Sequence, residues 1–399
     1  MSVLIAGELS AGLQQQVSTM FDMGGLNCRV CPDFDAARDM LTEEDQPSAV
    51  LLHIDAPGAR DFVRWMRRQS SLFGVPLLVT VDWPSPEEFQ RASELGADDV
   101  LVDGDRVGIL RRARVLSALD PAAATMEPKL GRCLVEHPDP VRRVGLGRVL
   151  MQAGFDARFV GSVEELIASA RSAPPAMVVL AETMTMPEAI QRVTKVRQAT
   201  KKPDLPCVVT LSREDVARAA TLRERLPAMA LLREGASSSD ALFNVNQMMV
   251  REAQRNERHS RRLLFETLCG FRELDAESQP SFSLSYNASR GGIYVRTYNL
   301  PPKGVRLELR LRPPQRAAAL ALVGRVAWMR PPGKGPGTPV GFGVEFLQPD
   351  CAARDWEVWQ ESIRQAEAAA PEPLHVAEVV ELPARPAQPA RPAGVSVAP

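Results

Sequence analysis

Residues 305–312 read VRLELRLR, and this stretch decides what kind of structure the last third of the chain forms. Its apolar positions are Val305, Leu307, Leu309 and Leu311, and its charged positions are Arg306, Glu308, Arg310 and Arg312. Strict alternation with a period of two places the apolar side chains on one face of a β-strand and the charged ones on the other. The stretch therefore predicts a strand with one face in a core and the other in water.

Similar stretches flank this strand and predict a small all-β domain. Five of them are separated by turns rich in Gly and Pro: LLFETLCGF (263–271), SFSLSYNAS (281–289), GGIYVRTY (291–298), ALALVGRVAWM (319–329) and VGFGVEFL (340–347). Six strands within about 90 residues favour a small antiparallel barrel. After them, Trp356, Trp359 and Ile363 recur at helical spacing, so we expect a helix that packs on the barrel, either as ordinary core or as a lid on an open end.

The first 250 residues have a different pattern, in which short apolar runs alternate with amphipathic segments. In the first half the runs are VLIAG (3–7), AVLLHI (49–54), VPLLVTV (75–81) and DVLV (99–102). Strands that alternate with helices of roughly 10 to 15 residues indicate βαβ units and a parallel sheet. Ser85 and Pro86 mark the start of one helix and Gly96 marks its end, because these residue types suit an N-cap, a first helical turn and a C-cap.

The same succession recurs in the second hundred-odd residues, with apolar runs at 133–135, 177–180, 206–211 and 228–232. A repeat with a period of about 130 residues indicates a duplicated domain rather than a solenoid. Asp120–Lys129, with its prolines and consecutive alanines, is interpreted as the linker. The predicted fold class is multidomain: two doubly wound α/β domains (1–120 and 130–250), a small antiparallel β-barrel with a C-terminal helix (255–368), and a disordered Pro/Ala-rich tail (369–399).

Composition excludes several classes of function. The chain has 48 basic and 49 acidic residues and a formal net charge of −1, so no global field points to a nucleic acid polymer or a membrane surface. We find no run of roughly 18 apolar residues and no basic leader, and therefore expect a cytoplasmic protein without membrane insertion. The six cysteines are scattered, and Cys28 and Cys31 fall in an expected strand where they face opposite sides, so we expect neither a metal site nor a redox site.

Both α/β halves resemble receiver domains of bacterial two-component systems, with GADDVLV (96–102) as the closest local match. The resemblance implies a five-stranded doubly wound sheet of flavodoxin-like order. It does not extend to the chemistry, because His53 and Thr183 occupy the positions of the phosphate-accepting Asp.

The other receiver groups are reduced as well. Only Glu8 in the first half and Glu136 in the second stand where an acidic pair would hold magnesium, which needs several carboxylates. We therefore expect that neither half is phosphorylated by the usual route. An alternative stays open, because Asp55 and Glu182 lie within two positions of the lost acceptors.

Two short motifs carry the chemistry of a binding site: RHSRR (258–262) and NASRGG (287–292). The guanidinium groups of Arg258 and Arg262 can bind phosphate in a bidentate manner and can stack on or hydrogen-bond to guanine. Asn287 and Ser289 supply neutral donors and acceptors at a tight turn, and Gly292 leaves room for a ligand to approach the backbone. Alone, the first motif fits a charged helix face and the second fits ordinary turn chemistry. Together and in this order they indicate an anion and purine clamp.

With these motifs in place, residues 255–350 resemble a PilZ domain, a family that binds the bacterial second messenger cyclic di-GMP. The resemblance is carried by RHSRR, LLFETLCGF, NASRGGIYV, GRVAWM (324–329) and GFGVEFL (341–347), in the family's order. It implies that Arg258 and Arg262 contact phosphates and guanine edges. It also implies that Asn287 and Ser289 hydrogen-bond the guanine or its phosphate, while Gly292 permits the turn. The family often has Asp where Asn287 stands, and an amide is a poorer acceptor for guanine N–H groups, so this departure bears on affinity.

Two functions follow as hypotheses. The first is a non-enzymatic signalling protein that binds cyclic di-GMP and relays its level to partner proteins in bacterial motility or polarity control. The alternative is a ligand-independent scaffold that binds other proteins through its receiver-like and PilZ-like surfaces. We expect no enzyme, cofactor or metal, since the sequence shows no nucleophile elbow and no phosphate-binding loop. We also expect the last helix of the second α/β domain, from about Ser239, to run into the Arg motif.

Overall fold

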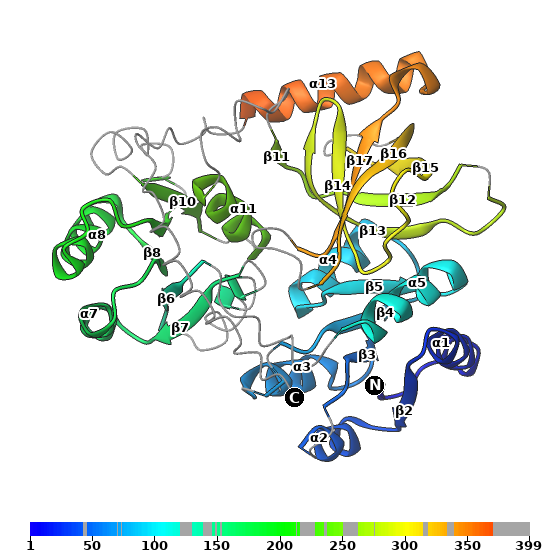
Figure 1. Ribbon diagram of the computed structural model, residues 1–399, viewed down its shortest axis with the longest axis horizontal. Coiled ribbons are helices and arrows are strands. Elements are labelled where there is room, and N and C mark those ends of the chain that lie inside the picture. The colour runs from blue at the N-terminus through cyan, green and yellow to red at the C-terminus, as the bar shows by residue number, and fades with distance from the viewer. Residues whose placement is uncertain are drawn as a thin grey trace, which may run out of the picture.

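The structure, a computed structural model, consists of two α/β domains and a β-barrel (Figure 1). It describes residues 1–42, 46–69, 71–72, 74–119, 130–138, 146–147, 150–151, 154–212, 214–215, 228–234, 238–249, 262–274, 276–313, 318–332 and 339–369. The expected linker, Arg258, Arg261 and nearly all of the expected tail lie outside the described residues. The predicted limits of the domains fall in or beside these segments and remain predictions.

The first α/β domain is a parallel sheet with helices on both faces (Figure 1). Its strand order is β2-β1-β3-β4-β5, the flavodoxin-like order that the receiver resemblance implies. Val17 and Phe21 of α1 are buried on one face, and Phe62 of α3 and Phe89 of α4 are buried on the other. Its elements are β1 (Ser2–Ala6), α1 (Ala11–Met23), β2 (Asn27–Cys31), α2 (Phe34–Thr42), β3 (Ala49–His53), α3 (Ala59–Arg68), β4 (Leu77–Val81), α4 (Pro86–Leu95), β5 (Asp99–Val102) and α5 (Arg106–Ser117).

Local signals in this domain act as expected. The Ser85 hydroxyl accepts a hydrogen bond from the Glu88 amide at 3.2 Å and begins α4, and Gly96 ends α4 with a φ of 94°. A left-handed φ of this kind favours glycine because other residues would bring Cβ against the backbone. Cys28 and Cys31 pack against the two opposite faces of the sheet, as predicted, and both are free thiols.

The second α/β domain repeats the first. Read from β7, its parallel strands follow the order β7-β6-β8-β9-β10, which is the same topology. Leu242 and Val245 of α11 are buried against this sheet, as their helical spacing predicts. The expected continuation of α11 toward the Arg motif lies outside the described residues. The described elements are β6 (Arg132–Glu136), β7 (Asp156–Val160), α7 (Val163–Ser172), β8 (Met177–Met184), α8 (Met186–Thr200), β9 (Cys207–Leu211), β10 (Met229–Arg233) and α11 (Ser238–Met249).

The barrel is antiparallel, as predicted, and its ring of strands is closed. Among the described residues, six strands form the ring in the order β13-β12-β15-β16-β17-β14, and a pairing of β13 with β14 closes it. The short β11 pairs with β13 beyond the end of β12. The elements are β11 (Leu263–Leu264), β12 (Leu268–Glu273), β13 (Ser281–Ser289), β14 (Gly292–Arg296), β15 (Arg306–Leu311), β16 (Leu320–Arg330), β17 (Gly341–Phe346), the 3-10 turn η1 (Gln348–Asp350) and α13 (Ala353–Ala369).

The barrel core confirms the alternation in β15. Leu307, Leu309 and Leu311 are fully buried, whereas Arg306 and Arg310 are exposed. Helix α13 lies across one end of the barrel (Figure 1), and its Trp359 and Ile363 are part of the same core. The helix therefore belongs to the barrel fold, which bears out the interpretation of its Trp and Ile spacing as core packing.

Candidate functional site

The candidate residues gather on the outer face of the hairpin that β13 and β14 form. Asn287 pairs with Tyr294, and Ser289 pairs with Gly292, so these side chains follow one another toward the hairpin turn. The register shifts between Ser285 and Asn287. Alternation alone would place Asn287 on the inner face with Ser285, whose partner Val295 lies in the barrel core. The bulge instead places Asn287 on the outer face, because a bulge changes the side that the following residues occupy.

Arg262 reaches the same face from β11. Leu264 pairs with Asn287 and Leu263 with Ala288, so the antiparallel register places Arg262 opposite Ser289. Its guanidinium carbon lies 5.8 Å from the centre of the Trp328 ring. A guanidinium over an indole ring is attracted by the negative face of the ring. The structure thus brings together Arg262, Asn287, Ser289 and Gly292, whereas Arg258 lies outside the described residues.

Exposure differs between the two polar side chains of the site. Asn287 is only 5% exposed, and Ser289 is half-buried with its hydroxyl 3.5 Å from the Gly292 carbonyl oxygen. A molecule that hydrogen-bonds Asn287 must therefore displace its neighbours. Polar groups in such a sheltered place form stronger hydrogen bonds than exposed ones, because water competes less.

Packing against a neighbouring strand explains why position 292 is a glycine, and the sequence did not reveal this. A Cβ at this position would lie 2.3 Å from the Val344 carbonyl oxygen of β17. Gly292 is therefore required for the close approach of β14 and β17, and its backbone does not adopt the left-handed conformation found at Gly96. The part expected of Gly292 at the turn and in ligand binding stays a prediction.

Aromatic residues complete the site and were not among the predicted site residues. Trp328 stacks on Tyr294 with ring centres 4.8 Å apart and an angle of 18° between the planes. Gly343 makes this possible, because a Cβ there would lie 2.3 Å from Trp328 Nε1. The only sequence signals were the Gly-x-Gly of GFGVEFL and the Trp of GRVAWM. Neither shows that a second bulge, between Val326 and Trp328, turns the indole outward.

The aromatic contacts continue into the second α/β domain. Tyr286 lies edge to face with Tyr294, at 6.2 Å and 75°, and with Phe243 of α11, at 6.1 Å and 74°. The Asn246 side-chain amide donates to the Tyr286 hydroxyl at 3.4 Å. Burial raises the pKa of Tyr286 above its usual range, so the phenol stays neutral and able to donate a hydrogen bond. One face of the site therefore rests on the second α/β domain.

The hairpin turn is held by α13. Trp359 Nε1 and Gln360 Nε2 both donate to the Arg290 carbonyl oxygen, at 3.2 and 2.9 Å. The Arg290 guanidinium forms an ion pair with Glu367 at 2.7 Å. These contacts fix the turn that carries Ser289.

The receiver-like edges of the two sheets hold ion pairs. In the first domain, His53 Nε2 lies 3.2 Å from Asp82, while its Nδ1 accepts from the Asp55 amide, and the Asp55 carboxylate forms an ion pair with Arg91. The carboxylates of Asp82 and Asp55 are therefore each in contact with a side chain of the same domain.

In the second domain, an arginine stands between the acidic residues. Arg192 lies 3.0 Å from Glu182 and 3.9 Å from the buried Glu136. The Arg192 guanidinium thus provides positive charge beside these carboxylates, the role that a divalent cation has in a magnesium site. Across the part of the chain that the structure describes, no three His, Cys, Asp or Glu side chains come together as metal ligands would. None of its described helices has the length and apolar character to cross a membrane.

Comparison with known proteins agrees with the barrel geometry. The sequence model of the PilZ domain family matches residues 253–356. The barrel is a PilZ domain. This match covers the Arg motif, the hairpin with Asn287 and Ser289, and the strand that carries Trp328. A comparison with curated proteins finds no match to the chain.

The solved structures similar to this chain include both response regulators and a PilZ domain. The inhibitor of motility MotI/DgrA of Bacillus subtilis is 19% identical with a TM-score of 0.24; the match covers 28% of this chain and 52%, about half, of that one. The PilZ domain of YcgR from Escherichia coli, determined with c-di-GMP, is 15% identical with a TM-score of 0.22 and coverages of 28% and 93%. The chemotaxis response regulator CheY4 of Vibrio cholerae is 24% identical with a TM-score of 0.23 and coverages of 26% and 85%. At these TM-scores the likenesses carry no functional argument.

Proposed function

We propose that this protein is a non-enzymatic signalling protein that binds cyclic di-GMP through its PilZ domain. It relays the level of the messenger to partner proteins, in bacterial motility or polarity control, and does so in the cytoplasm. The observation that supports this most is the convergence of Arg262, Asn287 and Ser289 on one outer face of the barrel.

The chemistry of these groups suits a cyclic dinucleotide. Arg262 offers a planar cation that can bind a phosphate with two hydrogen bonds or lie against a guanine edge. Asn287 and Ser289, on the strand next to Arg262, offer neutral donors and acceptors. These groups suit a base edge or a phosphate oxygen. We assign Arg258 the role of a second cation, on the strength of the motif alone.

Isothermal titration of the full chain with cyclic di-GMP tests this function. We expect saturable binding at micromolar ligand or tighter, and a strong loss of affinity in the double variant Arg258→Ala, Arg262→Ala. Arg306→Ala is a matched control, because Arg306 is an exposed arginine of the same barrel that pairs with Asp350. No heat of binding at tens of micromolar ligand would reject the proposal.

One observation favours the scaffold as a second candidate. Asn287 is 5% exposed, and the outer face of the hairpin is packed against both α/β domains, as it would be in a protein that no longer admits a ligand. A cellular phenotype of the double arginine variant identical to wild type would favour the scaffold. A phenotype like that of a gene deletion would favour the ligand.

A further inference from the structure

The β13–β14 hairpin connects the candidate site to the first α/β domain. Ser289 and Gly292 lie at its turn, whereas Ser281, at the start of β13, and Thr297, just after β14, lie at its open end. Ser281 and Ser289 are eight positions apart in one strand, which corresponds to about 26 Å. Contacts at the open end can therefore affect the position of the turn only through strands β13 and β14.

Arg112 of α5 forms the centre of a buried polar cluster at this open end. The guanidinium is 0% exposed. Its Nε donates to Asp99 at 3.0 Å, and its two terminal nitrogens donate to Asp105 at 3.2 Å and to the Val100 carbonyl at 3.0 Å. These partners all belong to the first α/β domain. The domain therefore presents two carboxylates whose remaining oxygen lone pairs face the barrel.

The barrel supplies the donors that these carboxylates need. The Thr297 hydroxyl and the Tyr298 amide donate to Asp99 at 2.8 and 2.6 Å. The Ser281 hydroxyl donates to Asp105 at 2.8 Å. Hydrogen bonds to ionised acceptors are roughly twice as strong as neutral ones. We call Asp99, Asp105, Arg112, Ser281 and Thr297 the joint cluster.

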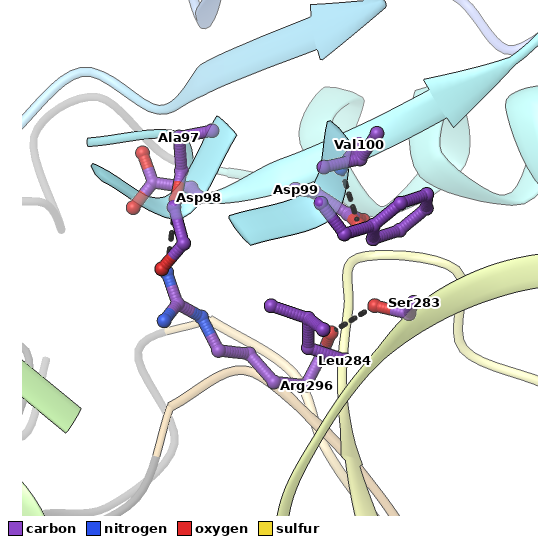
Figure 2. Close-up of a pocket in the computed structure, with 9 residues that line it drawn as sticks. Ala97, Asp98, Asp99, Val100, Ser283, Leu284 and Arg296 are labelled. Atoms are coloured by element: carbon purple, nitrogen blue, oxygen red, sulfur yellow. Dashed lines mark hydrogen bonds between the residues drawn. The ribbon is translucent and has the colours of Figure 1, made fainter. Parts of the chain in front are cut away.

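Further contacts surround the joint cluster. Figure 2 shows Arg296, the last residue of β14, extending across to the Ala97 carbonyl oxygen, to which it donates at 2.9 Å. On the other side, Arg111 forms an ion pair with Glu273 of β12. Phe282 and Leu284 of β13 pack against the apolar core of the first domain. A cavity of about 20 Å³, room for about one water, lies between the two parts beside Arg296. A larger cavity of about 170 Å³ lies between α5 and the barrel, beside Arg111 and Ser281.

We propose that the first α/β domain braces the β13–β14 hairpin, so that the joint cluster is a set of positioning residues for the ligand site at the turn. Within the barrel, β13 also pairs with β12 and β14 also pairs with β17. The bulge between Ser285 and Asn287 nevertheless interrupts the hairpin ladder between the joint cluster and the turn. Binding groups must be held within a fraction of an ångström of their working geometry. Anchoring the open end limits the tilt of Asn287 and Ser289. This inference rests on the proposed function for its ligand, but the bracing itself does not.

Substitution of Thr297 tests the brace without touching the site. Thr297→Asp introduces a carboxylate beside Asp99 and Asp105 and repels them. Thr297→Val is the matched control of similar shape. In the double variant Asp99→Asn, Thr297→Asp the contact between positions 99 and 297 again contains a single carboxylate, and Arg112 still has two carboxylates around it. If the two side chains are in direct contact, this variant should restore the packing of the barrel on the first domain. Each full-length variant is measured by amide hydrogen exchange of residues 285–296 and by titration with cyclic di-GMP.

We expect Thr297→Asp to speed amide exchange in the hairpin and to weaken cyclic di-GMP binding by about tenfold. Thr297→Val removes the hydroxyl that donates to Asp99 but adds no charge, so it should change both less than Thr297→Asp does. The double variant should return both toward wild type. Rescue also shows that a loss in the single variant is not a failure to fold.

Unchanged exchange in Thr297→Asp overturns the brace. Faster exchange with unchanged affinity overturns the positioning role and leaves ligand binding intact. If the wild-type protein does not bind cyclic di-GMP, the proposed function fails and the positioning role fails with it; the exchange measurement then decides on the brace alone.

Discussion

The guanidinium of Arg262 lies over the indole of Trp328, with its carbon 5.8 Å from the ring centre. This contact orients the cation along the outer face of the PilZ domain, opposite Ser289. Trp328 is itself held by stacking on Tyr294 and by the absence of a side chain at Gly343. The position of the proposed ligand-binding arginine therefore depends on residues that would not touch a phosphate.

Replacement of Arg262 by Ala should weaken cyclic di-GMP binding by about tenfold to a hundredfold, because a charge-assisted hydrogen bond contributes about 1.5–3 kcal/mol. Arg262→Lys should lie in between, since an ammonium keeps the charge but cannot form a bidentate pair. Titration calorimetry measures both, with Arg306→Ala as the control. Wild-type affinity in Arg262→Ala would remove this residue from the site.

Gly343→Ala should destabilise the barrel by about 1–3 kcal/mol, because overpacking forces neighbours to move. The new Cβ would lie 2.3 Å from Trp328 Nε1, so the indole must leave Tyr294 or β17 must shift. Gly291→Ala is the control, since a Cβ there meets nothing within 4 Å. Urea unfolding gives the free energies, and equal stability of the two variants would contradict the proposed packing.

Arg112→Met should cost about 3–5 kcal/mol of unfolding free energy, because it leaves two buried carboxylates without their cation. Arg114→Met, at an exposed position of the same helix, should change stability by no more than about 0.5 kcal/mol. Denaturant titrations of both variants are compared with wild type. A small effect at Arg112 would show that the carboxylates find other partners.

The ion pair between Arg272 and Glu308 predicts a pH dependence. The Arg272 hydrogen bond, 2.7 Å from Nε to the carboxylate, lowers the pKa of Glu308 below its ordinary value. A lowered folded-state pKa contributes stability above the ordinary pKa of about 4.3, and this contribution is lost as the pH falls through the lowered pKa. Glu308→Gln should therefore be less stable than wild type near neutral pH, and the difference should shrink as acid is added.

Thermal unfolding from about pH 7 to about pH 3 measures this difference. Glu345→Gln is a matched control, because Glu345 also pairs with an arginine on the barrel but is 56% exposed. A difference between Glu308→Gln and wild type that grows toward acid would have the wrong sign for this account.

Sequence patterns sufficed for the parts of the fold that repeat at short range. The alternation of β15 and the succession of strands and helices in both α/β domains are periodic, so each element could be placed from its own residues. The motifs around Arg262 and Asn287 were likewise local. The two bulges were not predictable, because one extra residue in a strand leaves no mark in the pattern. They turn Asn287 and Trp328 onto the outer face.

The joint cluster could not be predicted from the sequence either, for a different reason. In the run VGILRRARVL, Arg111 and Arg112 look equivalent, yet the first is partly exposed in an ion pair and the second is fully buried. What distinguishes Arg112 is that it bonds two buried carboxylates, Asp99 and Asp105, which in turn accept from Thr297 and Ser281 of the barrel. Such long-range partners are set by the packing of whole domains, which the sequence of one helix does not determine.

A crystal structure of the protein with cyclic di-GMP would show directly whether the ligand binds beside Arg262. We expect one ligand on the outer face of the PilZ domain, with a phosphate or guanine edge at Arg262 and hydrogen bonds to Asn287 and Ser289. A ligand bound elsewhere, or none at saturating concentration with Asn287 still covered, would contradict this expectation.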